Sequence, residues 1–521
     1  MRTLKKSYHK AFFTLIKAYK RYYFGAQLLK IPFYKLISKQ TKLAKWQEKR
    51  EQRREFLREA LNGFKSAKHL YKTFHKESEK WLNSQEFKEK YLDTKHPFPP
   101  LLNPDKIDYN AIPAEIAWEW NLPLPPNYDF FYITNGSSAS AATHRFLEEC
   151  NLRSGLMKSP RCPKGVFMRH FDIFKMNTSN NIFACWSGIL GYFDSDFFIY
   201  RFTKKVPLLY VARDPIEKLQ HTINHIDGEG YMGNIANINL TCNYINVGFT
   251  RQSYDSNVLP TMKSLCYSSN IMEDYGYSKF MLDSLLKMMK SKISSIHIIE
   301  FDDLKPDKAF DTFCKIADTL GFERPKNKEI FTNRINRNRG ALITLPTTLY
   351  VHNDDLQNVF DGKNEGQNLD SLSKSGGFNI IITLPHYLNE AQKNYADITE
   401  QIEPNLIIDD TKVLIIIDKN ELKKLKENAP LFEAAKGYLK GYVEALKQNA
   451  AELKANYISE EQILEHLREN KDLRLKIKEI LDNELNYIKQ NHPEFIQKWK
   501  YYLEFEKMCA ELDGVQNKGE K

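Results

Sequence analysis

Alternating strand and helix patterns over residues 128–323 most constrain how this chain can fold. Short apolar, β-rich runs recur there, and each is followed by a turn and a helical pattern. Because parallel strands are joined by helices that cover both faces of their sheet, the alternation predicts an α/β fold with a parallel sheet between helices. We expect strands at 128–134, 165–174, 206–215 and 295–304. A turn that runs into a helix is expected at 135–150, a helix directly after the third strand, and further helices at 275–290 and 307–322.

The rest of the chain predicts further regions, as its 521 residues are too many for one core. Prolines that bar helix continuation predict a linker, and apolar runs at 378–385 and 411–418 predict buried strands of an insertion. Opposite charges at helical spacing, such as Glu421 with Lys424, predict a helical C-terminal region. The expected regions, in order, are a basic helical region, a proline-rich linker, the α/β domain, a loop and β insertion, and a helical region, at 1–95, 96–127, 128–345, 346–419 and 420–521.

Positive charge is concentrated at the N-terminus. Residues 1–50 hold fourteen Lys or Arg and one acid, whereas the remainder holds 62 Lys or Arg and 65 Asp or Glu. Aromatic side chains recur at helical spacing between these lysines, a pattern typical of helices on membrane surfaces. We expect residues 1–40 to contact an anionic membrane, with packing against the body as the alternative. Nucleic acid is not an expected partner, because no recognition motif follows and the remainder is not basic.

Cysteine usage indicates a reducing compartment. The seven cysteines are scattered and form no CxxC pair, which argues against a disulfide framework or a zinc ribbon. We found no metal-ligand spacing and therefore expect no metal. The expected location is cytoplasmic, with peripheral attachment to the inner face of the cell membrane through the basic N-terminus.

A small-residue turn follows the first predicted strand. Residues 135–140, Asn-Gly-Ser-Ser-Ala-Ser, lead directly into a helix, whose first turn offers free N–H groups and a positive dipole end. Gly136 lets the backbone approach an anion, and Ser137, Ser138 and Ser140 add donors. The turn lacks the Gly-Lys-Ser/Thr of a P-loop, so a Walker-type NTPase is not expected. Ordinary helix capping is the alternative interpretation.

An arginine and an aspartate end the third predicted strand, in the sequence Ala-Arg-Asp-Pro. Open α/β sheets bind ligands at this end of their strands. Arg213 suits phosphate because its planar fork pairs with two oxygens, and we expect Asp214 to cap the next helix and orient the guanidinium. The alternative is an ion pair of Arg213 with Asp214 or Glu217.

The sequence HIIEFDDLKPDKAFDTFCKIADTLGF closely resembles a stretch common to sulfotransferases, in which a strand ends in Tyr/Phe-Glu-Asp-Leu before a helix ending in Phe-Leu-Gly. Other segments over residues 128–323 follow in the family's order. The resemblance implies that YITNGSSAS binds the 5′-phosphosulfate end of the donor and that Arg213 binds its 3′-phosphate. It also places His170, within the second predicted strand, on the catalytic base; a buried histidine satisfied by a backbone carbonyl is the alternative.

Further site residues follow from the resemblance. Arg169 is expected to add positive charge beside His170, and His221 stands where the family has a serine eight residues after its arginine. Arg337 and Arg339 lie where a basic, glycine-containing loop closes over the 3′-phosphate, although a solvated loop is the alternative. Thr134 replaces a Lys or Arg of the family's phosphate loop. The complete set of expected donor-binding residues is Thr134, Asn135, Gly136, Ser137, Ser138, Ser140, Arg213, His221, Arg337 and Arg339.

The resemblance implies a sulfotransferase-like, P-loop-like topology and a transferase. It would move a group, sulfuryl first, from a nucleotide-linked donor such as 3′-phosphoadenosine 5′-phosphosulfate to a hydroxyl of a bacterial surface carbohydrate. The whole chain also resembles an uncharacterised bacterial family of surface-polysaccharide and capsule loci whose members are labelled sugar transferases. Transfer of a glycosyl or phosphorus-containing group is therefore an alternative, as is a non-catalytic membrane-associated scaffold.

Overall fold

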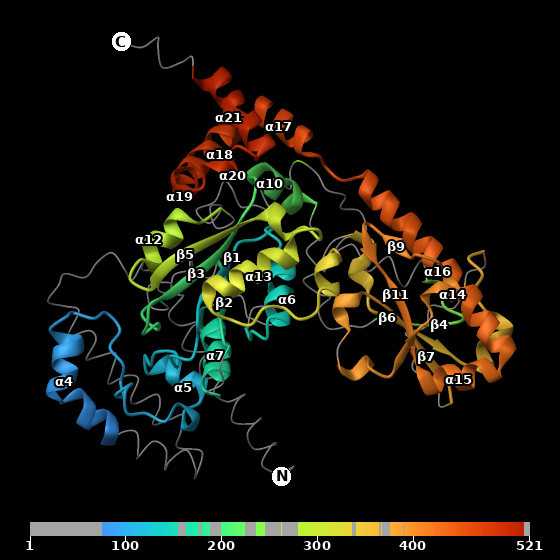
Figure 1. The fold of residues 1–521 in the computed structure, drawn as a ribbon, viewed down its shortest axis with the longest axis horizontal. Helices are drawn as coiled ribbons and strands as arrows, with labels where there is room; N and C mark the ends of the chain where they lie inside the picture. Colours follow the sequence, from blue (N-terminus) through green and yellow to red (C-terminus); the bar gives the residue numbers. More distant parts are fainter. Residues whose placement is uncertain are drawn as a thin grey trace, which may run out of the picture. The chain divides into compact units, whose positions relative to one another are not determined.

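The computed structural model describes most of the chain between residues 76 and 514 (Figure 1). The described ranges are 76–154, 163–176, 180–187, 199–224, 236–244, 262, 280–335, 340–363, 366, 376–388 and 390–514. The predicted membrane-contacting residues 1–40, and Arg337 and Arg339, lie outside these ranges.

The chain divides into two units, Met1–Pro123 and Leu124–Lys521, and the division falls within the predicted linker. Among the described residues, the first unit includes α4 Gln85–Phe87, the π-helix η1 Lys88–Leu92, the 3-10 helix η2 Tyr109–Ala111 and α5 Ala114–Glu119.

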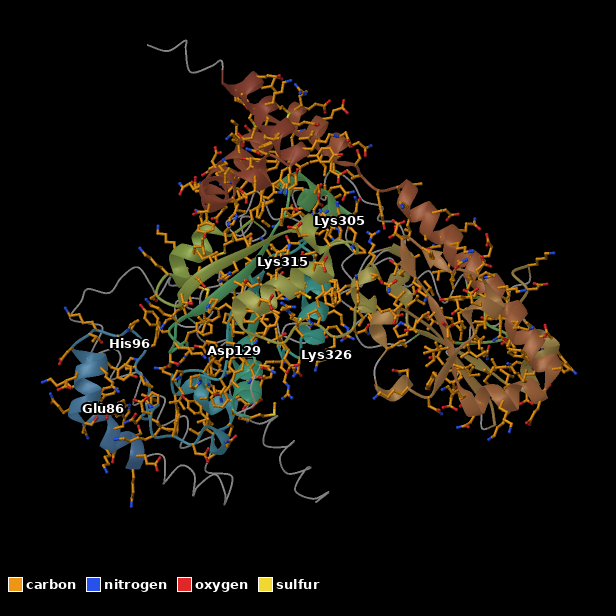
Figure 2. The ribbon with its side chains drawn as sticks, in the orientation of Figure 1. Glu86, His96, Asp129, Lys305, Lys315 and Lys326 are labelled. Atoms are coloured by element: carbon orange, nitrogen blue, oxygen red, sulfur yellow. The ribbon has the colours of Figure 1, made fainter. Side chains whose placement is uncertain are left out.

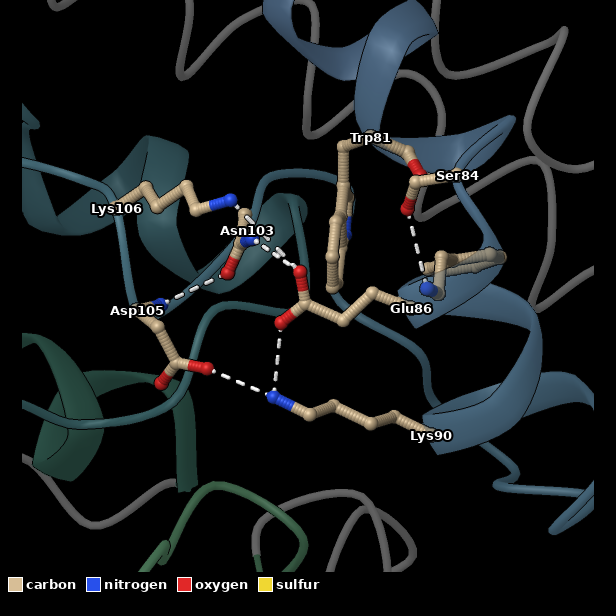
Figure 3. Close-up of polar contacts among 8 residues, drawn as sticks. Trp81, Ser84, Glu86, Lys90, Asn103, Asp105 and Lys106 are labelled. Atoms are coloured by element: carbon tan, nitrogen blue, oxygen red, sulfur yellow. Dashed lines mark hydrogen bonds and ion pairs between the residues drawn. The ribbon is translucent and has the colours of Figure 1, made fainter.

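A surface network in the first unit holds the chain after η1 against α4 (Figure 3). Lys90 Nζ donates hydrogen bonds to Glu86 and Asp105, each at 2.9 Å, and Asn103 Nδ2 donates to the other Glu86 oxygen at 3.3 Å. Lys106 Nζ lies 3.8 Å from that same oxygen. These groups are largely exposed, so the network fixes local geometry more than it stabilises the unit.

The proline-rich stretch is packed within the first unit rather than extended. The Pro99 carbonyl accepts from Asn121 Nδ2 at 3.0 Å, and the Pro100 carbonyl accepts from Trp81 Nε1 at 3.1 Å. Both donors are buried. The carbonyl groups of these two prolines, which lie outside helices and strands, thus accept hydrogen bonds from buried side chains.

The second unit contains the predicted parallel sheet. Its strands are β1 Phe131–Thr134, β2 Phe183–Trp186, β3 Val206–Ala212 and β5 Ile293–Glu300. They lie in the order β2-β1-β3-β5, and every pair is parallel (Figure 1). The chain leaves β1 for β2 on one side and returns to β3 on the other, so the boundary between β1 and β3 is the switch point of the sheet.

Helices cover both faces of this sheet, as the alternation predicted. The helices are α6 Ser140–Glu149, α7 Pro163–Phe174, α10 Pro215–Ile223, α12 Asp283–Met289 and α13 Ala309–Leu320. Phe146 of α6 and Phe313 of α13 share one core cluster with Tyr132 of β1. On the opposite face, His170 of α7 lies against Phe183, with ring centroids 4.4 Å apart.

The predicted strand at 165–174 is wrong, because these residues belong to helix α7. Val166, Phe167, His170, Phe171 and Phe174 form its buried face. They recur at intervals of three and four residues, which is a helical period, and a proline opens the helix at its first position. The second strand of the sheet in chain order is instead β2, which begins nine residues after the end of α7 and pairs with β1.

A second sheet has the order β4-β6-β7-β11-β8. Its strands are β4 Ala236–Asn239, β6 Thr347–Val351, β7 Phe378–Thr383, β8 Tyr395–Asp397 and β11 Leu414–Asp418, and β9 Ile407–Ile408 pairs with β10 Thr411–Lys412. The strands predicted at 378–385 and 411–418 are confirmed as members of an added sheet. β4 pairs in parallel with β6, so a segment from the predicted α/β domain contributes an edge strand.

The helices from α14 onward form two groups. Those that pack on the second sheet are α14 Thr399–Ile402, α15 Lys419–Glu427 and α16 Ala429–Ala455. Those that follow are α17 Glu460–Glu469, α18 Lys471–Glu484, α19 Asn486–Asn491, α20 Pro493–Ile496 and α21 Lys500–Asp513. α10 contacts α17 and α21, and α12 contacts α18 (Figure 1).

Within the last group, Arg474 ties α18 to its neighbours. It is 3% exposed. Its Nε and Nη2 donate to both Asp513 oxygens at 2.8 and 2.9 Å, and its Nη1 donates to the Leu467 and Arg468 carbonyls at 2.9 and 2.8 Å. The guanidinium thereby holds the pKa of Asp513 below its usual value. Among the residues described, no helix is long and apolar enough to cross a membrane.

Candidate functional site

The chain after β1 turns sharply before helix α6. This β1–α6 loop, residues 135–139, has two residues other than glycine in left-handed backbone conformations, Ser137 at φ 66° and Ala139 at φ 53°. Such conformations cost energy in most residues and persist where surrounding contacts impose them. A Cβ added to Gly136 meets nothing within 4 Å, so the space beside its backbone is open. Ser140 is the first residue of α6.

Arg213 lies against this loop. Its Nη1 donates to the Ser137 carbonyl at 2.9 Å, and its Nε donates to Glu217 at 3.1 Å. The guanidinium also lies over the Phe301 ring, 3.9 Å from the centroid. The side chain is 12% exposed. The prediction that Arg213 and the loop share the carboxyl edge of one parallel sheet is confirmed, and the predicted ion pair with Glu217 is present as well.

Asp214 caps helix α10, as predicted, by accepting from the Ile216 N–H at 2.8 Å. Its other oxygen accepts from the N–H groups of Tyr501 and Tyr502 at 3.1 Å each, at the start of α21. The group beside the guanidinium is Glu217 rather than Asp214. Burial raises the pKa of Asp214 to about 6, and the N–H donors oppose that rise.

Two buried oxygens in the loop have no hydrogen-bond partner among the residues that the structure describes. Asn135 donates to the Tyr210 hydroxyl, which leaves its Oδ1 unsatisfied, and Ser138 Oγ is unsatisfied as well. Both residues are 1% exposed. Since most buried polar atoms in folded proteins are paired, these two oxygens of the loop before α6 are available to a ligand or to an ordered water.

The loop is held against α10 through hydroxyl groups. Ser137 Oγ lies 2.9 Å from Thr222 Oγ1. His221, expected to replace a phosphate-binding serine, is half-buried in the last turn of α10, one residue before the threonine that makes this contact. The hydroxyl that contacts the loop from this end of α10 belongs to Thr222, a residue that no sequence motif singled out.

Two charged residues at the end of β5 were also missed. Glu300 is 4% exposed and accepts from the Asp302 N–H at 2.7 Å and from Trp499 Nε1 at 3.2 Å. Burial raises its pKa, and these donors oppose the rise. Lys305 follows the 3-10 helix η7 Phe301–Leu304 just beyond β5 (Figure 2) and pairs with Asp302 at 2.6 Å. The Asp-Asp-Leu-Lys sequence was the available signal for this cation.

Lys305 lies within electrostatic reach of the Arg213 site. Its pKa is raised, first by the hydrogen bond to Asp302 and further by the charges of Glu217 and Glu300. Glu217 is the same carboxylate that pairs with Arg213. Lys305 therefore interacts electrostatically with the carboxylate that pairs with Arg213, while its own ion-pair partner is Asp302.

His170 lies elsewhere and is fully buried. Its Nδ1 bonds the Val166 carbonyl at 2.9 Å, and its Nε2 accepts from the Ala184 N–H in β2 at 3.1 Å. Burial lowers its pKa to about 4. Both ring nitrogens of His170 are thus hydrogen-bonded to the backbone. This geometry matches the alternative interpretation, a buried histidine satisfied by a backbone carbonyl, and it does not favour a role as a catalytic base. Neighbouring Arg169 is half-buried on the same helix.

One predicted donor-binding residue, Thr134, remains. Thr134 is buried at the end of β1, and its hydroxyl donates to the Asn135 carbonyl at 3.3 Å. Among the described side chains, no group of three His, Cys, Asp or Glu is arranged to hold a metal ion.

A family model described as a protein of unknown function, DUF2972, matches residues 298–512. This span is less than half of the 521-residue chain. It begins near the end of β5, and it contains the second-sheet strands from β6 onward and most of the C-terminal helices. No curated protein and no solved structure matches the chain.

Proposed function

We propose that the parallel sheet and its helices form a nucleotide-dependent transferase of sulfotransferase-like topology. It moves a group, sulfuryl first, from a nucleotide-linked donor to a hydroxyl of a bacterial surface carbohydrate. The observation that carries the proposal is the hydrogen bond from Arg213 Nη1 to the Ser137 carbonyl. It joins the two segments predicted to hold phosphate at the switch point of the sheet, where α/β proteins bind nucleotides.

The β1–α6 loop has the chemistry that a phosphate needs. The first turn of α6 presents free N–H groups and the positive end of a helix dipole. The buried Ser138 hydroxyl, which has no partner in the described part of the chain, can donate to a phosphate oxygen. The unsatisfied Asn135 Oδ1 is an acceptor and suits a hydroxyl or N–H of the donor, or an ordered water. A bound nucleotide would satisfy both atoms.

Positive charge at the site comes from outside the loop. Thr134 stands where a cation was expected, and its side chain is buried in the strand end. Arg213 supplies one charge, and Lys305 beyond β5 supplies a second within electrostatic reach of Glu217. A phosphate that binds here exchanges the Glu217 contact of Arg213 for charge-assisted hydrogen bonds of its own. The proposal gives His170 no part in the chemistry.

The proposal is tested by calorimetric titration of adenosine 3′,5′-bisphosphate, CDP and UDP into the wild-type protein and an Arg213→Ala variant. We expect one nucleotide to bind and the variant to lose about 1.5–3 kcal/mol, roughly ten- to a hundredfold in Kd. Arg213→Lys should recover only part of this loss, because the planar fork is gone.

Arg324→Ala is the matched control. This arginine also makes a two-point pair, with Asp318 at 2.7 and 2.6 Å, but it is 64% exposed and follows α13. It should leave nucleotide affinity unchanged. Circular dichroism checks that each variant folds. If the wild type binds none of the three nucleotides, the proposal is wrong and a scaffold function becomes the better interpretation.

A further inference from the structure

The C-terminal segment, defined here as residues 458–514 with helices α17–α21, is joined to the parallel-sheet domain by buried polar contacts. Asn224, at the end of α10, is fully buried. Its Nδ2 donates to the Ile458 carbonyl at 2.8 Å, and its Oδ1 accepts from the Ile458 N–H at 3.0 Å. This two-point contact fixes the start of the C-terminal segment at α10, the helix that Arg213 and Asp214 precede.

One carboxylate caps two helices at this junction. Asp214 accepts from the α10 backbone with one oxygen and from Tyr501 and Tyr502 of α21 with the other. Both helices direct the positive ends of their dipoles at this side chain. Since Asp214 follows Arg213 directly in the chain, the contact to α21 fixes the backbone from which the Arg213 side chain extends.

One further hydrogen bond and one electrostatic interaction link the C-terminal segment to the carboxyl edge of the sheet. Trp499, just before α21, donates to Glu300 at the end of β5. Glu460, at the start of α17, has a pKa raised by burial and next by the charge of Glu217, while Arg213 opposes the rise. The carboxylate of Glu460 therefore interacts electrostatically with both Arg213 and Glu217.

The same capping device occurs at a second place that does not involve the Arg213 site. Both Asp283 oxygens, at the start of α12, accept from the Tyr487 N–H of α19 at 3.2 and 3.1 Å. In return, Glu484 of α18 accepts from the N–H groups of Leu282 and Ser284 at 2.9 and 3.0 Å. This junction has the same chemistry and gives a matched control.

We propose that Asp214 is a positioning residue through which the docked C-terminal segment holds Arg213 in its phosphate-binding position. The inference rests on the proposed function. Docking of α21 and binding of a nucleotide phosphate then favour each other, because both require the same backbone at Arg213 and Asp214. Such coupling is reciprocal, and typical coupling changes each equilibrium by about five- to 150-fold.

The first test compares Asp214→Asn with Asp283→Asn. An asparagine keeps one acceptor for the Ile216 N–H but turns an NH₂ group toward the Tyr501 and Tyr502 N–H groups, so α21 loses its cap. We expect faster hydrogen exchange at α21 and at least a fivefold weaker Kd for the nucleotide that binds wild type. In Asp283→Asn the amide oxygen can still accept from the Tyr487 N–H, so exchange at Tyr487 should rise only through the lost charge, and that Kd should stay unchanged.

The second test needs no variant and covers the case in which Asp214→Asn does not fold. A saturating concentration of the bound nucleotide should slow exchange of the Tyr501 and Tyr502 amides in wild type at least fivefold, and slow that of Tyr487 less. Unchanged exchange at Tyr501 and Tyr502, or equal nucleotide affinity of a folded Asp214→Asn, would overturn this inference alone. A wild type that binds no nucleotide overturns the proposed function, and the inference with it.

Discussion

At the scale of single residues, the candidate site combines satisfied and unsatisfied polar groups. Arg213 has a carbonyl, a carboxylate and an aromatic ring as partners, so its position is set before any ligand arrives. Asn135 Oδ1 and Ser138 Oγ are buried, and no described residue pairs with either atom. An unpaired buried polar atom costs about 1–3 kcal/mol, which a ligand that pairs it would remove. Preorganised charge beside unsatisfied oxygens is what a binding site requires.

Replacement of Ser138 should lower nucleotide affinity without lowering the stability of the fold. Ser138→Ala removes a buried hydroxyl that has no partner, so we expect the free energy of unfolding to stay within about 1 kcal/mol or to rise. Nucleotide affinity should fall about tenfold, because the hydroxyl no longer donates to the ligand. Urea unfolding and calorimetric titration provide the two measurements.

Ser84→Ala is the control for that substitution. Ser84 Oγ caps α4 in the first unit by accepting from the Phe87 N–H at 3.1 Å. Its loss should cost about 1 kcal/mol and leave nucleotide affinity unchanged. Ser138→Ala with unaltered affinity would mean that the hydroxyl does not face the ligand.

His170 is expected to contribute to stability. His170→Ala leaves the Ala184 N–H unpaired and opens a cavity against Phe183, so the free energy of unfolding should fall by roughly 2–4 kcal/mol. Nucleotide affinity of the folded fraction should not change. His466→Ala, which removes a half-buried histidine of α17, should cost less than about 1 kcal/mol in denaturant titrations. A stable His170→Ala protein would restore the prediction that this residue serves catalysis.

The pH dependence of stability should identify the same histidine. The pKa of His170 is about 4 in the folded protein and 6.5 in the unfolded chain. As the pH falls, the unfolded chain therefore binds a proton first. Stability therefore declines between pH 6.5 and 4, by about 3 kcal/mol for this group. His170→Gln should lose that component when unfolding is compared with wild type across the range. Equal slopes for the two proteins would show that His170 titrates normally.

At the scale of elements, positions that follow strands and end helices carry the strongest local signals. The turn after β1 and the Arg-Asp-Pro after β3 were predicted from sequence and lie together in the fold. The second strand was misplaced because α7 is apolar enough to pass for a strand. The intervals of three and four residues along its buried face identify it as a helix.

Two glycines should respond differently to a methyl group. Gly321 ends α13 at φ 78°, so Gly321→Ala should cost about 1 kcal/mol through backbone strain alone. Gly136→Ala meets nothing within 4 Å and should leave stability nearly unchanged, while the methyl group obstructs a phosphate in the loop and weakens nucleotide binding. Thermal unfolding and titration distinguish the two. Equal effects on stability would contradict the difference in backbone conformation.

At the scale of the whole chain, the helices after α16 belong with the parallel sheet, although the second sheet intervenes in sequence. Their own cohesion depends on buried Arg474 and its pair with Asp513. Arg474→Met leaves Asp513 and two carbonyls unpaired, so we expect a local loss of about 3–5 kcal/mol. Hydrogen exchange should rise across α17–α21 and stay unchanged in β7 and β11.

Arg324→Met is the comparison for that variant. It breaks an exposed two-point pair and should alter exchange little, since exposed pairs contribute about 1 kcal/mol or less. Arg474→Met with full protection of α17–α21 would show that apolar packing alone holds these helices together.

The sequence by itself determined the class of the fold and the place of the candidate site. Local periodicity and turn residues identify strands and helices, and the rule that parallel strands end at one edge brings the β1–α6 loop to Arg213. These inferences need only neighbours in the chain.

The tertiary structure alone decided which partners complete those residues. Asp214 meets Tyr501 across 287 positions, Glu300 meets Trp499 across 199, and β4 joins a sheet whose other strands begin at Thr347. The sequence predicts that Asp214 caps α10, because the residue directly precedes that helix. The same sequence would be found whether or not Asp214 also accepted hydrogen bonds from α21. Contacts of this range leave no period or spacing in the chain, because they depend on how finished elements pack.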